Sequence, residues 1–221
     1  TTGDYNVGLG DNAGTAITTG IKNVAIGVNA LDSNTTGNYN TAVGYAALTS
    51  NTTSNDNTAI GFQVLHDNTT GTSNTGLGAS ALQSNTTASN NTAVGYYALK
   101  VNTTGSENVA FGQAALDANT TGASNTALGR ASLSAATTAN ANTAVGESAM
   151  RFSTTGTFNT AVGSSSLDAN TTGSYNTAIG QNSLTSSTTA SYNTSVGRSA
   201  LYANTTGAGN TASGYAAMYA N

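Results

Sequence analysis

The amino-acid sequence predicts an all-β protein with the fold of a parallel β-solenoid (β-roll). The first observation is a 17-residue repeat that runs through the whole chain. The second is a composition with no Pro, Cys or Trp and only 6% charged residues, in which Asn, Thr, Ala, Gly and Ser dominate. The third is that large apolar residues recur at two places in each repeat. A unit with so little apolar surface cannot bury itself, so identical units must stack to form a continuous core.

The repeat divides residues 1–221 into thirteen rungs and predicts a single repetitive segment. Counted from the leading Asn as position 1, the units start at residues 6, 23, 40, 57, 74, 91, 108, 125, 142, 159, 176, 193 and 210. Asn at position 1, Gly at position 5 and Thr at positions 13 and 14 are present in every unit. Parallel rungs in register would therefore align Asn on Asn and Thr on Thr as side-chain ladders.

Each rung is expected to contain short strands at positions 1–4 and 11–14. The Gly at position 5 would supply a positive φ or allow a neighbouring backbone to approach closely. A helix is disfavoured, because Thr-Thr, Asn and Gly recur in every unit. The large apolar residues at positions 4 and 9 form the predicted core: Val43, Leu48, Ile60, Leu65, Val94, Leu99, Leu116, Val162, Leu167, Ile179 and Leu184.

The composition also excludes several classes of function. Five Lys and Arg residues and a net charge of −4 cannot neutralise a run of phosphates, so no nucleic-acid partner is expected. No apolar run approaches the roughly 18 residues needed to insert into a membrane. With one His, His66, and no Cys, the chain lacks a zinc ligand set and a nucleophile–base pair. We therefore predict that the protein is not an enzyme, has no catalytic residues, metal site or cofactor, and carries His66 on its surface.

The charged residues fall only at positions 6, 10, 11, 16 and 17, which indicates an outer, solvated face. Arg130 and Glu147 share position 6 in neighbouring rungs and could form an ion pair, with less than about 1 kcal/mol at stake. Eight Asn-Thr-Thr segments match the acceptor sequence for N-glycosylation. The alternative interpretation is that these residues are ladder residues and the match is a by-product of the repeat.

Aromatic residues gather at positions 6 and 17, on either side of the first predicted strand. Rows of exposed Tyr are typical of surfaces that contact glycans or proteins. The alternative is that these rings cover the thin core or pack between subunits. The candidate surface contacts are Tyr39, Tyr45, Phe62, Tyr96, Phe158, Tyr175, Tyr192 and Tyr215.

The segments NVAIG (residues 23–27) and NTAVG (residues 40–44) resemble rungs in the head domains of trimeric autotransporter adhesins. The fuller pattern NTAxGxxALxxNTTG is similar to repeats in phage tail-fibre-like and bacterial surface-fibre proteins. The adhesin head has a shorter period, nearer 14 residues, and the chain shows no stalk or anchor. The resemblance implies a trimeric parallel β-roll, displayed outside the cell or on a virion and used for attachment to a host-surface protein or glycan.

Three functions follow as hypotheses. The first is an extracellular structural or adhesive fibre segment, an adhesin head or tail-fibre shaft that spaces or presents a receptor-binding surface. The second is a filament subunit that stacks end to end, suggested by the whole number of repeats. The third is an ice-binding β-solenoid, suggested by the Thr pair in every rung. Adjacent strand residues point to opposite faces, so only one Thr of each pair would face outward and the array would have a single row.

Overall fold

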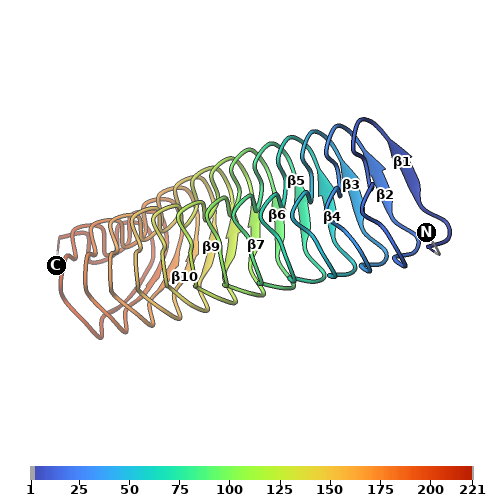
Figure 1. The fold of residues 1–221 in the computed structure, drawn as a ribbon. Coiled ribbons are helices and arrows are strands. Elements are labelled where there is room, and N and C mark those ends of the chain that lie inside the picture. The colour runs from blue at the N-terminus through green and yellow to red at the C-terminus, as the bar shows by residue number, and fades with distance from the viewer. Residues whose placement is uncertain (1–2, 221) are drawn as a thin grey trace. The chain divides into compact units, whose positions relative to one another are not determined.

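The computed structural model describes residues 3–220 and confirms the all-β parallel β-solenoid (Figure 1). Within that range the chain forms thirteen strands of three residues each and no helix. The first Thr-Thr pair of the repeat, Thr1 and Thr2, lies outside the described residues. Each rung contributes one strand, at positions 2–4 of the repeat.

The chain divides into two compact units, Thr1–Asn108 and Val109–Asn221, built from the same rung. The first holds β1 (Val7–Leu9), β2 (Val24–Ile26), β3 (Thr41–Val43), β4 (Thr58–Ile60), β5 (Thr75–Leu77) and β6 (Thr92–Val94). The second holds β7 (Val109–Phe111), β8 (Thr126–Leu128), β9 (Thr143–Val145), β10 (Thr160–Val162), β11 (Thr177–Ile179), β12 (Thr194–Val196) and β13 (Thr211–Ser213). Within each unit consecutive strands pair in parallel with like positions aligned, as Ala42 with Ala59 and Ala161 with Ala178.

The second strand expected at positions 11–14 does not form, and that prediction is wrong. The reason lies in the hydrogen bonds of the Thr pair. The amides of Thr154 and Thr155 both donate to the carbonyl of Thr171 in the next rung, at 2.8 and 3.2 Å. Two successive amides that share one acceptor bend the chain, whereas successive amides of an extended strand point to opposite sides.

The core is formed by position 9 together with the small residues at positions 3 and 8. Every predicted core residue at position 9 is fully buried: Leu48, Leu65, Leu99, Leu116, Leu167 and Leu184. The Ala residues at position 3, such as Ala93 and Ala161, are also fully buried. Because this burial is reached within one chain, the stack closes its core without a second copy.

The predicted core is wrong at position 4. Val43, Val94 and Val162 are half-buried, and Ile60 and Ile179 are exposed. The alternation of a β-strand explains the error: Ala at position 3 faces inward, so positions 2 and 4 face outward. Side-chain size suggested the opposite arrangement, but the small residue is the one that fits between the tightly stacked rungs.

The Gly at position 5 is confirmed as a conformational and steric requirement. Gly163 has φ of 130°, and a Cβ on it would lie 2.6 Å from the carbonyl carbon of Gly180 in the next rung. The buried side chains at position 9 are unusual as well, because Leu and Met there adopt φ between 48° and 55°. A left-handed conformation is rare for bulky residues and persists where the surrounding packing fixes it.

Buried Asn side chains form a ladder at position 1 in each unit, as the invariant Asn predicted, and a second ladder at position 12 of the first unit. At position 1, Asn159 Nδ2 donates to Asn142 Oδ1 at 3.2 Å and to the carbonyl of Gly173 at 2.9 Å. Asn159 Oδ1 in turn accepts from the amide of Asn176 at 2.9 Å. At position 12, Asn51 Nδ2 donates to Asn34 Oδ1 at 3.0 Å. These bonds satisfy buried backbone groups at the corners, where no strand pairing is available.

Position 8 of one rung packs against position 3 of the next, and the chain compensates for size at this contact. Val64 is the one Val at position 8, and the facing residue is Gly76 instead of Ala. A Cβ on Gly76 would overlap Val64 Cγ1. Elsewhere Ser183 and Ser195 occupy these two positions and their hydroxyls hydrogen-bond at 2.7 Å. At these two contacts the neighbouring rungs are therefore matched in volume or in polarity as well as in register.

Candidate functional surfaces

The outer face of the sheet in each unit presents two parallel rows of side chains, at positions 2 and 4. Position 2 is Thr in β3–β6 and in β8–β13, and position 4 is aliphatic in β1–β6 and in β8–β12. The rows are flanked by position 1, where Asn is buried in the inner rungs, and by the side-chain-free Gly of position 5. Each unit thus carries an uncharged strip of hydroxyl and methyl groups with no tall side chain immediately beside it in the rung.

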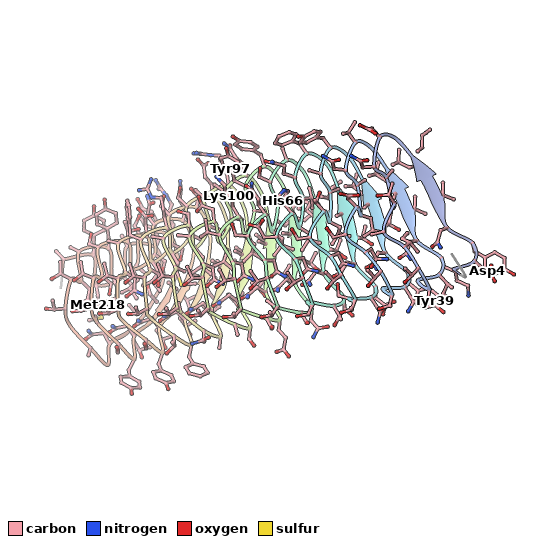
Figure 2. All side chains as sticks on the ribbon, viewed as in Figure 1. Asp4, Tyr39, His66, Tyr97, Lys100 and Met218 are labelled. Atoms are coloured by element: carbon pink, nitrogen blue, oxygen red, sulfur yellow. The ribbon has the colours of Figure 1, made fainter. Side chains whose placement is uncertain are left out.

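The eight candidate surface aromatics are all exposed, with between 47% and 74% of their surface accessible. They do not cover the core, which the Leu and Ala columns fill. Figure 2 shows Tyr39, at position 17, at one edge of the first unit and Tyr97, Lys100 and His66 at the opposite edge. Gly at position 5 separates position 6 from the outward strand positions 2 and 4, and Asn at position 1 separates them from position 17, so the two aromatic rows border the strand face without filling it.

Rings in the same column stack on one another along the unit. Phe158, Tyr175 and Tyr192 form a ladder with centroid separations of 5.1 and 5.2 Å and interplanar angles of 8° and 1°. Tyr45 and Phe62 stack in the same way at 5.4 Å. Stacking leaves the ring edges and the Tyr hydroxyls outward, while the inner ring faces are covered by their neighbours. A ligand would meet a ridge of edges and hydroxyls, not a series of open ring faces.

Several aromatic contacts were missed in the sequence. Tyr202 and Tyr219 stack at 4.9 Å, and both occupy position 10 in neighbouring rungs. Tyr96 and Tyr97 stack at 3.8 Å, and Lys100 Nζ lies 4.0 Å from the Tyr97 ring centroid. The first pair could have been found by the rule that residues 17 apart share a column. The second could not, because it depends on how the turn after Gly95 folds.

The charged side chains all lie outside the core, as predicted, and two ion pairs form along columns. Arg130 and Glu147 pair at position 6, which confirms that expectation, and both are exposed. Arg151 Nη2 lies 3.0 Å from Asp168 Oδ2 at position 10, a pair that the column rule could also have predicted. Burial raises the pKa of the Asp168 carboxyl above its usual value, and the neighbouring Arg151 opposes that shift.

The Asn-Thr-Thr segments are ladder residues. Their Asn side chains, at position 12, are buried and donate to neighbouring carbonyl and amide oxygens, as Asn68 does to the carbonyl of Gly71 at 3.0 Å. The Thr at position 13 is half-buried in the inner rungs and its hydroxyl donates to the next rung, as Thr171 does to the Thr188 carbonyl at 3.0 Å. The folded chain therefore offers none of these Asn side chains to a modifying enzyme.

His66 is half-buried, and its Nδ1 lies 2.6 Å from Asp67 Oδ1. Within residues 3–220 no three His, Cys, Asp or Glu residues gather as metal ligands would. The same range contains no helix with the length and apolarity to cross a membrane.

Comparison of the chain with protein-family models, curated proteins and solved structures gives no match. The arguments for function therefore rest on the geometry of these surfaces and on the sequence resemblance.

Proposed function

We propose that the chain is an extracellular structural and adhesive fibre segment, which spaces or presents a receptor-binding surface at the cell surface or on a virion. The observation that carries this proposal is the division between constant and variable positions. Positions 1 and 5 never vary among the thirteen units, whereas the outward positions 6 and 17 each carry nine residue types. Such a division is typical of a scaffold whose binding properties are set on its outside.

The partner in this proposal is a host-surface protein or glycan that meets the position 17 aromatic ladder. Phe158, Tyr175 and Tyr192 are at least half exposed and are held in one orientation by mutual stacking. Rigid aromatic side chains lose little conformational entropy on binding, and Tyr adds a hydroxyl for hydrogen bonding. The ladder therefore offers affinity without a cavity.

Oligomeric state is a separate part of the proposal. The trimer rests on the resemblance alone, because position 9 is buried within one chain and needs no partner. Light scattering checks it: a trimer has a mass near 65 kDa, three times 21.7 kDa. A mass that rises with concentration would favour end-to-end filaments.

Binding is tested with beads that carry the purified protein, passed over immobilised mucin, cellulose and alginate. We expect retention on at least one surface, and its loss in the double variant Tyr175→Ala/Tyr192→Ala. Ala suits this backbone, since Ala141 occupies the same position with φ of 54°. The matched control is Tyr202→Thr, which removes a stacked ring from position 10, where Thr185 stands one rung earlier. Equal retention of both variants would remove the ladder from the proposal, and no retention of the parent protein on any surface would contradict adhesion to these polymers.

A further inference from the structure

The strip on the outer sheet face has a regularity that the aromatic and charged rows lack. In the second unit, β8–β12 place Thr at position 2 in five successive rungs and Leu, Val or Ile at position 4 in the same five. In the first unit, β3–β6 do so in four. The pairing is in register, so like residues repeat about every 4.8 Å across the strands and the two rows lie about 6.7 Å apart along them.

The Thr residues of this strip are half-buried in β8–β11 and exposed in β12, and their hydroxyls are not used in hydrogen bonds within the described part of the protein. The amide of Thr160 donates to the carbonyl of Asn176 at 2.8 Å, but within the described residues its hydroxyl has no hydrogen-bond partner in the protein. The Thr residues at position 2 in β8, β9, β11 and β12 show the same pattern. By contrast, the position 13 hydroxyls are committed to the next rung, as that of Thr154 is to the Thr171 carbonyl at 3.0 Å.

A repeating array of free hydroxyls and methyl groups, with no formal charge, fixes water positions without competing for ions. The buried Asn ladders hold the rungs in register, so the array is ordered before any ligand arrives. The flanking positions add no side chain above it, because Asn at position 1 points into the core and Gly has none.

We propose that the Thr and aliphatic rows of β8–β12, and the shorter set in β3–β6, bind ice. This places the ice-binding surface on the strand face and not on the Thr pair at positions 13 and 14. A second copy of the chain is the alternative occupant. An apolar interface with a second copy would bury the row of free Thr hydroxyls. Each buried hydroxyl left without a hydrogen-bond partner would cost roughly 1–3 kcal/mol. Crystalline water satisfies every hydroxyl, and the core needs no partner chain.

The test is thermal hysteresis and ice shaping by the whole chain, with Thr160→Arg as the variant at the centre of the strip. Thr172→Arg is the matched control, since Thr172 is an exposed Thr at position 14 of the same rung. Circular dichroism melts verify that all three proteins fold, and light scattering gives their masses. Val162→Arg, in the second row, provides an independent variant.

We expect faceted ice crystals and measurable hysteresis for the parent and the control, and loss of most of the hysteresis in Thr160→Arg and Val162→Arg. The absence of hysteresis and ice shaping in the parent would overturn the proposal, as would equal hysteresis in Thr160→Arg and Thr172→Arg. A multimeric parent that Thr160→Arg converts to single chains would also overturn it, by assigning the strip to an interface between copies. None of these outcomes depends on adhesion through the aromatic ladder.

Discussion

Leu99 and Val94 lie five residues apart in one rung, and their side chains differ in burial. Leu99 is fully buried, whereas Val94 is half-buried on the outer face of the sheet. Both are aliphatic, and both recur at fixed positions of the repeat. The difference shows that a recurrent apolar residue is not by itself a core residue in a tightly wound solenoid. The strand alternation about Ala93 decides which side chains face inward.

The largest effect on stability is expected from variants that introduce a carboxylate at each of these two positions. Leu99→Asp would bury an unpaired charge and leave a cavity, and we expect it to lower the free energy of unfolding by about 4–5 kcal/mol or to prevent folding. Val94→Asp places the carboxylate on the solvent side, and we expect a loss of about 1 kcal/mol or less. Urea unfolding followed by circular dichroism measures both. Equal losses would mean that position 4 is covered in solution.

A second test concerns volume on the inner side. Gly76→Ala would force a methyl group against Val64, and we expect it to destabilise the chain by about 1–3 kcal/mol through overpacking. Adding Val64→Ala should recover much of that loss, because Ala faces Ala at this contact in other rungs, as Ala81 faces Ala93. A double-mutant cycle measures the coupling. Simple additivity of the two changes would contradict the assigned contact.

A smaller, stabilising effect is expected from adding an Asn at position 12 of the second unit, as in the Asn ladder of the first unit. At position 12 of the second unit Ser187 replaces Asn, and both its Oγ and the Oδ1 of Asn170 are buried without a hydrogen-bond partner. Ser187→Asn should donate to Asn170 and raise the free energy of unfolding by about 1 kcal/mol. The new side chain can also donate to the carbonyl of Ala190 at position 15, as Asn85 does to the carbonyl of Ala88 at 3.0 Å. Ser186→Asn, half-buried at position 11, is the control, with little change expected; an equal gain there would show that the ladder is not the cause.

The smallest effect is expected on the outer side, at Asp168. Burial raises the pKa of its carboxyl, so the folded chain binds the proton more tightly than the unfolded chain does. The free energy of unfolding should therefore decline slightly as the pH rises through the acidic range above the usual value of 3.8. Asp168→Asn should flatten this decline, measured by urea unfolding between about pH 3.5 and 6. If Asp168→Asn showed a decline of the same size, the pH dependence would come from other groups. Asp32→Asn is the control variant.

Much of the architecture could be predicted from the repeat alone. The fold, the rung boundaries, the Asn ladders and the role of Gly163 all follow from one requirement, that identical units must stack in register. Two features could not be predicted in this way. The sequence shows that Val94 and Leu99 are apolar but not which side of the strand each one occupies. It also shows Thr154 and Thr155 as good strand residues, whereas shared hydrogen bonding bends the chain there.

The candidate surfaces were predicted unevenly for the same reason. Columns of like position gave the exposed aromatic rows and the Arg130–Glu147 pair, since both depend only on residues 17 apart. The Thr and aliphatic strip was missed, because it depends on the direction of the strand side chains. Attention to positions 2 and 4, which alternate with the inward-facing position 3, rather than to the adjacent Thr pair, would have indicated it.

Cysteine accessibility tests the central claim most directly, because the chain has no Cys of its own. Val162→Cys and Leu167→Cys place one thiol on the outer face and one in the core of the same rung. The account predicts that a maleimide labels the first readily under native conditions, and the second only when the chain unfolds. Protection of both thiols would show that another chain covers the strip, and ready labelling of Leu167→Cys would contradict the single-chain core.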